Sequence, residues 1–291
     1  MGPFEYFEPA TVEEAVSLLK KYGEGAKILA GGTDLVVMMR EREIKPRYVI
    51  NLGRIAGLNY VHLDGDKGLR IGALTTIAGL ERAPELKSSY RIISQAAAQL
   101  ATIAIRNMAT IGGNLCNAAP SADMAPPLLA LKGAVKLTGT AGERIVPLEE
   151  FFIGPGVTTL KPNELMIEIQ VPAVPAHTGG MYLKHGVKGA AGLAVVGVAA
   201  VVTLDIRDSV FEEVDIALGA VAPTPIRAKR AEALLKGQKI SDGLIEEAAR
   251  VTSDESSPID DVRGSAEYRR EMVRVRTWEA IRGALKLAKS V

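Results

Sequence analysis

The sequence contains very little cysteine. Only Cys116 is present among 291 residues, which excludes an internal disulfide, an all-cysteine zinc site and a cysteine-ligated iron–sulfur cluster held within this chain. The three histidines, His62, His177 and His185, lie far apart and show neither metal-ligand spacing nor a nucleophile triad. We therefore expect any metal centre that works with this chain to belong to another one.

An excess of charge of one sign is also missing, and so is a long apolar run. The 35 Lys and Arg residues are balanced by 34 Asp and Glu residues, so we expect no nucleic-acid partner. The amino terminus has no basic start followed by an apolar stretch, so we expect no secretory signal and a cytoplasmic location. The most apolar segment, residues 190–204, is too short for a typical membrane span, and its valines favour a buried strand.

Glycine, in contrast, is abundant, with 29 residues, and two glycine pairs stand out. The first, Gly31-Gly32, follows the short apolar run of residues 27–30, which predicts a strand. It precedes Thr33 and Asp34, either of which can cap a following helix. Because glycine has no Cβ atom, backbone N–H groups in such a turn can converge on the phosphate oxygens of a diphosphate.

The second pair, Gly112-Gly113, predicts a similar turn between an apolar segment and a helix. Neither pair continues as G-x-G-x-x-G, and no basic phosphate loop follows, which disfavours a Rossmann or a Walker site. Taken alone, each pair is more simply explained as an ordinary turn.

The chain is long enough for more than one domain, because a single hydrophobic core stops growing at about 250 residues. Thr11 is expected to cap a helix in a small α/β unit that ends near Arg54. The Pro- and Gly-rich segment 171–180 is the best candidate for a linker. These signals divide the chain into three predicted domains, at residues 1–54, 55–175 and 180–291.

Longer segments give the two glycine pairs a context. In order, KILAGGTDLV, IRNMATIGGNLCNAAPSADMAPPLLAL, ELMIEIQVP and YLKHG resemble the flavoprotein subunit of the xanthine dehydrogenase and carbon monoxide dehydrogenase family. GAVAPTPIRAKRAEALLKG and RGSAEYRREM resemble the separate C-terminal domain of that subunit. The resemblance implies an α+β fold, with a two-part FAD-binding domain of the vanillyl-alcohol oxidase (PCMH) type followed by a C-terminal α/β domain of the CO dehydrogenase flavoprotein type.

The same resemblance implies which residues contact FAD. Two glycine segments would wrap the diphosphate, Asp123 would accept hydrogen bonds from ribose or ribityl hydroxyls, and Met166 or Ile167 would line the cofactor. Lys184 would lie near the flavin, where a cation favours the anionic reduced form. The implied cofactor-binding residues are Ile28, Leu29, Ala30, Gly31, Gly32, Thr33, Asp34, Leu35, Thr110, Ile111, Gly112, Gly113, Asn114, Asp123, Met166, Ile167 and Lys184.

Several of these residues also have an ordinary structural explanation. Asp123 could cap the helix that follows it, and Lys184 could be a solvated surface lysine. Met166 could belong to the core. Asn114 and Asn117 could be turn residues in the left-handed conformation.

As to function, the resemblance implies an oxidoreductase subunit that is active only in complex. A molybdenum large subunit would oxidise the organic substrate, two-iron, two-sulfur clusters in a small subunit would collect electrons, and the FAD of this chain would pass them to an external acceptor. The resemblance also implies a dimer of heterotrimers. We expect the FAD to be non-covalent, because no histidine lies in the glycine segments and the lone Cys116 is more simply a small buried hydrophobe.

Two other functions stay open from the sequence. A self-sufficient flavoenzyme of the same fold would oxidise or reduce its own substrate on the flavin, and would need its own acid or base in a substrate pocket. A non-catalytic nucleotide-binding or scaffold protein would use the glycine turns only as architecture. Bound flavin separates the last function from the first two, and co-purifying molybdenum and iron separate the first two from each other.

Overall fold

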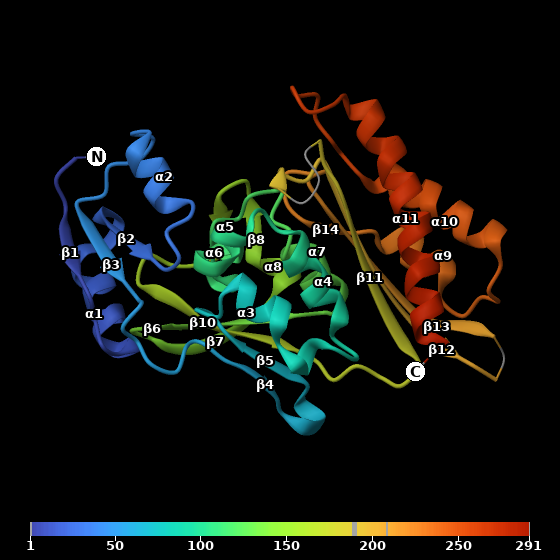
Figure 1. The fold of residues 1–291 in the computed structure, drawn as a ribbon, viewed down its shortest axis with the longest axis horizontal. Coiled ribbons are helices and arrows are strands. Elements are labelled where there is room, and N and C mark those ends of the chain that lie inside the picture. Colours follow the sequence, from blue (N-terminus) through green and yellow to red (C-terminus); the bar gives the residue numbers. More distant parts are fainter. Residues whose placement is uncertain (1, 188–190, 208, 291) are drawn as a thin grey trace.

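The computed structural model describes residues 2–187, 191–207 and 209–290. Three main β-sheets follow one another along the long axis of the molecule (Figure 1). The N-terminal sheet lies at one end, and the C-terminal sheet lies at the other, with a cluster of short helices and the middle sheet between them (Figure 1). No helix of the described residues has the length and apolar character needed to cross a membrane.

The N-terminal sheet is parallel, in the order β1-β3-β2. Its first helix begins where the sequence predicts, since Thr11 Oγ1 accepts a hydrogen bond from the N–H of Glu14 at 3.2 Å. The buried side chains of Leu19, from this helix, and Ile50, from the sheet, belong to one small hydrophobic core. The elements are β1 (Glu5–Phe7), α1 (Val12–Tyr22), β2 (Ala26–Leu29), α2 (Leu35–Arg40) and β3 (Tyr48–Asn51).

The middle sheet is antiparallel, in the order β4-β5-β10-β6-β7. Short helices pack beside it around the largest hydrophobic core of the molecule. The strands are β4 (Val61–Leu63), β5 (Leu69–Gly72), β6 (Ala134–Gly139), β7 (Gly142–Pro147) and β10 (Glu164–Val171), with a separate small pair, β8 (Phe152–Gly154) and β9 (Val157–Thr158). The helices are α3 (Ile77–Arg82), α4 (Arg91–Gln99), α5 (Ile103–Met108), α6 (Ile111–Cys116), α7 (Ala125–Ala130) and α8 (Leu148–Phe151).

The C-terminal sheet is antiparallel, in the order β11-β12-β13-β14. Helix α11 packs against β11 and β12, and α4 and α7 of the middle part pack against the same sheet. Residues 196–204 are therefore buried without interruption, as expected for a strand covered on both faces. The elements are β11 (Thr178–His185), β12 (Val196–Asp205), β13 (Val210–Gly219), β14 (Ile226–Arg227), α9 (Lys229–Leu235), α10 (Asp242–Glu255) and α11 (Ala266–Ala288).

Two expectations about this region need correction. The predicted valine-rich strand begins at Val196 and not at residue 190, which lies outside the described residues. The predicted linker is shorter than 171–180, because β11 already begins at Thr178. Gly179 pairs with Val202 of β12 within the strand. Glycine is needed there because α11 approaches so closely that a Cβ atom would overlap the helix backbone.

Candidate functional site

The first glycine pair lies in the loop between β2 and α2. Gly31 packs against the backbone of Met108, so closely that a Cβ atom would overlap the Met108 carbonyl group. Gly32 has a φ of 73°, which a residue with a side chain rarely adopts. Within the described chain, the backbone N–H groups of residues 31–34 have no protein acceptor. Four successive unpaired N–H groups form the kind of concave backbone surface that binds anions.

The predicted helix cap at this loop is not formed by a side chain. Asp34 occupies the position before α2, but its carboxylate accepts no N–H group of the helix. It accepts instead a long hydrogen bond of 3.5 Å from the Thr33 hydroxyl group. Desolvation raises the pKa of Asp34 against the lowering effect of that bond. The start of α2 therefore has no side-chain cap, and of the N–H groups of residues 35–37 only that of Val36 is paired within the described chain, with the carbonyl oxygen of Gly32.

The second glycine pair does not form the predicted turn. Gly112 and Gly113 lie in the first turn of α6, which Thr110 caps by accepting a hydrogen bond from the N–H of Gly113 at 3.1 Å. A Cβ atom on Gly112 would lie 2.7 Å from the carbonyl oxygen of Ala73. The glycines are therefore required where α6 starts against the end of β5, and tertiary packing overrides their weak helix propensity.

The hydrogen bonds of this segment also differ from those of the first loop. The N–H groups of Ile111 and Gly112 donate to Thr75 and Ala73, at 3.0 and 2.9 Å, and those of Gly113 and Asn114 both donate to Thr110. Only the N–H group of Thr110 has no acceptor among the described residues, so the backbone here offers far fewer free donors for a diphosphate than the first loop. A side-chain acceptor is also unpaired, because the buried Asn114 Oδ1 has no hydrogen-bond partner among the described residues.

The left-handed alternative for the asparagines is wrong. Asn117, which ends α6, has a φ of −66°, and Asn114 lies within the helix. The left-handed residue in this segment is Ala118, with a φ of 48°.

Met166 and Ile167, the two apolar candidates on β10, have different surroundings. Met166 is only 3% exposed and belongs to the core of the middle part. Ile167 lies at a register shift between β10 and β6, and its carbonyl oxygen accepts a hydrogen bond from the N–H of Ala73 at 3.0 Å. Ala73 also accepts a hydrogen bond from Gly112, so the backbone of Ile167 is linked through Ala73 to the start of α6. The Met166 side chain shares the core of the middle part with Ile111 and Leu115 of α6.

Asp123 and Lys184, 61 residues apart in the sequence, form a buried ion pair. The Lys184 ammonium group donates to Asp123 Oδ2 at 2.8 Å, and the Tyr182 hydroxyl group donates to Oδ1 at 2.8 Å. The side chains of Lys184 and Asp123 are 3% and 7% exposed. Burial raises the pKa of Asp123 against the opposing effects of Lys184 and Tyr182, and burial beside Asp123 raises the pKa of Tyr182 well above its usual range.

This pair excludes the two ordinary explanations for its members. The residue that precedes α7 as its cap is Met124, and the Asp123 carboxylate bonds to β11 instead of to the helix. Lys184 is not a solvated lysine, since its ammonium group also donates to the carbonyl oxygen of Gln99 at 3.0 Å. The pair thereby joins the middle part of the chain to the C-terminal sheet.

Two glutamines of α4 lie along the outer edge of β11. Gln95 Oε1 accepts the N–H of Tyr182 at 3.4 Å, and Gln99 Oε1 accepts the N–H of Lys184 at 3.3 Å. Gln99 Nε2 donates to the carbonyl oxygen of Tyr182 at 3.3 Å. Side-chain amides therefore satisfy backbone groups of β11 that a further strand would otherwise pair with.

Arg106 has a position that the sequence did not lead us to expect. It is 8% exposed, and its guanidinium group donates to Glu81 Oε2 at 3.0 Å and to the carbonyl oxygens of Leu100 and Ala101 at 3.1 and 2.9 Å. The only sequence signal was its place in the segment IRNMATIGGNLCNAAPSADMAPPLLAL, which resembles the family. Arg106 holds the turn between α4 and α5.

The cysteine and His185 show no feature of a reactive or metal-binding site. Cys116 packs against the core, and desolvation raises the pKa of its thiol to about 12, which disfavours the reactive thiolate. His185 Nε2 lies 2.8 Å from the Tyr268 hydroxyl group, on the α11 side of the sheet. In the described part of the chain, no group of three or more histidine, cysteine or acidic side chains could hold a metal ion.

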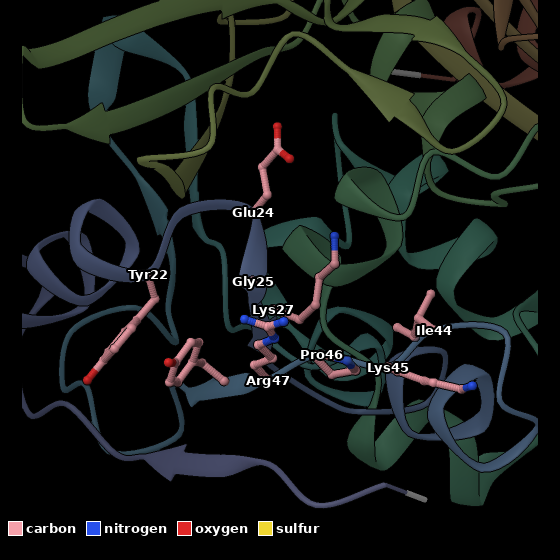
Figure 2. A pocket seen from close by; sticks show the side chains of 9 residues that line it. Tyr22, Glu24, Gly25, Lys27, Ile44, Lys45, Pro46 and Arg47 are labelled. Carbon is pink, nitrogen blue, oxygen red and sulfur yellow. The ribbon is translucent and has the colours of Figure 1, made fainter.

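A surface hollow of about 540 Å3 lies beside the start of β2, at the end of the strand away from the glycine loop. Its lining includes Lys27, Lys45 and Arg47. In Figure 2 the side chains of Lys27 and Lys45 extend in different directions instead of converging on one point. The hollow is therefore no convergent anion site, and the glycine loop remains the better candidate.

Comparison with known proteins agrees with this arrangement. Residues 2–174 match the family described as FAD binding domain in molybdopterin dehydrogenase, and residues 182–284 match the CO dehydrogenase flavoprotein C-terminal domain. The chain is 31% identical to the xanthine dehydrogenase FAD-binding subunit of Escherichia coli O157:H7, over 97% of this chain and 96% of that protein. It is 34% identical to the carbon monoxide dehydrogenase medium chain of Afipia carboxidovorans, over 99% of each.

A solved structure extends the similarity to the whole fold. The carbon monoxide dehydrogenase of Hydrogenophaga pseudoflava, in a form that lacks the Mo-pyranopterin moiety of the molybdenum cofactor, contains a chain that superposes with a TM-score of 0.95. The two are 35% identical, and the similarity covers 98% of each chain. The chain therefore belongs to the family of FAD-binding subunits of the xanthine dehydrogenase and carbon monoxide dehydrogenase type of molybdenum hydroxylase.

Proposed function

We propose that the loop of residues 30–34 holds the diphosphate of FAD, and that the chain uses this FAD to pass electrons from iron–sulfur clusters of a partner subunit to an external acceptor. One observation carries the assignment of the loop. The N–H groups of residues 31–34 have no acceptor within the described chain, and a diphosphate supplies the acceptors that such a run of donors needs.

Other groups around the loop fit the same cofactor. The buried Asn114 Oδ1 lacks a donor, and the hydroxyl groups of FAD are donors. Ile167 offers a partly buried apolar side chain, and its backbone is linked through Ala73 to the start of α6. We propose that Asp123 and Lys184 act at the flavin end as a pair, in which the carboxylate fixes the ammonium group and a buried cation favours negative charge on the reduced ring.

The full set of cofactor-binding residues that we propose is the one that the family resemblance implies, but the two glycine segments have different roles. The first loop supplies the backbone donors, and the second segment supplies close packing and Asn114. Bound FAD can exchange single electrons with clusters and deliver two to an acceptor. The cofactor would extend from the loop of residues 30–34 past the middle part of the chain to β11, where the Lys184 ammonium group is kept out of water.

We propose an iron–sulfur small subunit and a molybdenum large subunit as partners, in a dimer of heterotrimers in the cytoplasm. The relatives named medium chains and the molybdenum enzyme with the same fold support this assembly. Large apolar side chains exposed on α5 and α2 also support a docked partner, since Ile103 and Met108 are 63% and 59% exposed, and Val36 and Val37 are 40% and 39% exposed.

A glycine substitution with a matched control tests the assignment of the loop. Gly32→Val forces a β-branched residue into a φ of 73° and displaces the N–H groups, so the purified chain is expected to lose its FAD. Gly57 has a φ of 84° and open space around it, so Gly57→Val suffers similar backbone strain away from the loop and should keep FAD. Equal FAD content in both folded variants would contradict the assignment.

The assembly is tested by co-expression with the neighbouring reading frames, followed by metal analysis. Iron and molybdenum are expected to co-purify with the chain, and the isolated chain loaded with FAD should turn over no organic hydroxylation substrate. A lone flavoprotein that oxidised such a substrate at full rate without either metal would instead be a self-sufficient flavoenzyme.

A further inference from the structure

The segment of residues 99–109 links the two ends of the proposed cofactor site. At its start, the carbonyl oxygen of Gln99 accepts a hydrogen bond from the Lys184 ammonium group at 3.0 Å. At its end, the Met108 carbonyl group packs against Gly31 of the first loop. The path between the two runs through the turn after α4 and through α5 itself. Any change in the shape of this segment must therefore alter how Lys184 and the loop lie relative to each other.

The turn at the start of this segment has a backbone conformation that needs support. Ala101 has a φ of 45°, in the left-handed region that a residue with a Cβ atom rarely adopts. The Arg106 guanidinium group donates to both carbonyl oxygens of the turn, those of Leu100 and Ala101. Glu81 of α3 holds the same guanidinium group at 3.0 Å.

Arg106 is also the one residue of α5 whose side chain is turned into the protein. The other five residues of this helix are exposed, Ile103 and Met108 among them at 63% and 59%. Arg106 is thus the one buried side chain of α5, and its bonds fix the turn at the start of the helix together with the Thr102 hydroxyl group, which accepts the N–H of Ile105 at 3.4 Å.

We propose that Arg106, held by Glu81, is a positioning residue of the FAD site, which fixes the distance between the Lys184 end and the glycine loop. The inference rests on the proposed function of these two places. Arg106 itself touches neither of them: it acts through the carbonyl groups of Leu100 and Ala101. A planar fork of N–H donors suits this task, because one group must reach a carboxylate and two carbonyl oxygens at once.

The substitutions that test this are Arg106→Ala, Arg106→Lys and Glu81→Gln. Lysine keeps the charge but not the fork, so Arg106→Lys should restore only part of what Arg106→Ala loses. Glu81→Gln keeps an acceptor and should have the smallest effect. Arg144→Ala is the matched control, because Arg144 likewise bonds to a carboxylate, Glu164, and to the carbonyl oxygen of Thr159, but outside the segment of residues 99–109.

Two quantities are measured on each folded variant, the Kd for FAD added to the apoprotein and the reduction potential of the bound flavin. In metal sites, removal of a group that orients the binding residues costs roughly ten- to a hundredfold in affinity, and a rise in Kd of the same order is expected for Arg106→Ala. If displacement of Lys184 weakens binding of reduced FAD tenfold more than that of oxidised FAD, the potential falls by about 30 mV. The Arg144→Ala control should change neither quantity.

The outcomes separate this inference from the proposed function. A wild-type Kd and potential in Arg106→Ala, together with loss of FAD in Gly32→Val, would overturn the role of Arg106 and leave the loop assignment standing. Unchanged FAD binding in both variants would overturn the loop assignment as well. Full rescue by Arg106→Lys would show that charge alone matters and would also overturn the inference, because the fork would then be dispensable.

Discussion

Asp123→Asn is expected to destabilise the chain strongly, because it removes the negative charge beside a buried ammonium group. The Lys184 side chain is 3% exposed, and its ammonium group lies 2.8 Å from the carboxylate. Asparagine has nearly the same shape and can still accept the hydrogen bond from Tyr182. The substitution therefore tests the charge of the pair with little change in packing.

The size of the effect follows from the burial of the pair. Removing one member of a buried ion pair costs about 3–5 kcal/mol, whereas replacing both members costs far less. For a chain of this size, the loss corresponds to a fall in Tm of roughly 6–20 °C. Lys184→Met should cost a similar amount, and the double variant should be more stable than the sum of the two single effects predicts.

Urea denaturation of the two single variants and the double variant gives the coupling energy directly. A coupling of at least about 2 kcal/mol is expected, and the same series in saturating FAD reports whether the pair also contributes to binding. Additive effects of the two substitutions would refute the reasoning, since they would mean that Asp123 and Lys184 do not act as a pair.

Three further predictions follow from other parts of the structure. Gly31→Ala should destabilise the chain more than Gly32→Ala. The new Cβ of the first overlaps a backbone carbonyl group, which costs about 3 kcal/mol, whereas the left-handed φ of the second costs about 1–2 kcal/mol. Urea denaturation should rank the two variants in this order, and the reverse order would contradict the packing. A hydrogen bond from Arg144 lowers the pKa of Glu164, so the stabilisation by this pair should be present above pH 4.5, the ordinary pKa, and be lost as the pH falls through the lower pKa of the folded state. When the free energy of unfolding is measured at several acidic pH values, it should fall less steeply with pH for Arg144→Ala than for the wild type. Identical slopes would count against the pair. Acid precipitation should release all of the FAD, because the Cys116 thiol, with a pKa of about 12, is a poor nucleophile for attachment; yellow colour in the pellet would show a covalent link.

The family, the α+β class and the cofactor could be predicted because they depend on motifs that are continuous in the sequence. The first glycine segment shows this well, since strand, loop and helix follow one another within 15 residues. The matches to known families confirm these predictions. The individual FAD-binding residues stay predictions, with the free N–H groups of the first loop as their strongest support.

What could not be predicted depends on contacts between distant parts of the chain. The second glycine pair has the composition of a turn, and only the contact of Gly112 with Ala73 shows why it begins a helix. A helix cap stayed open as the alternative for Asp123 because its partner Lys184 lies 61 residues further on. The place of Arg106 in a family segment did not reveal its role, since that role depends on carbonyl groups in a turn whose φ angles the sequence does not specify.

The contact between α4 and β11 has a consequence for how the protein avoids aggregation. Without Gln95 and Gln99, β11 would be an open edge of a strongly apolar sheet, and such an edge can pair with a strand of another molecule. During synthesis, the middle part of the chain emerges before β11 and can fold first. The backbone groups of β11 can then bond to Gln95 and Gln99 as soon as the strand forms. A C-terminal fragment produced alone would lack these glutamines, and its open strand edge could pair with that of another copy.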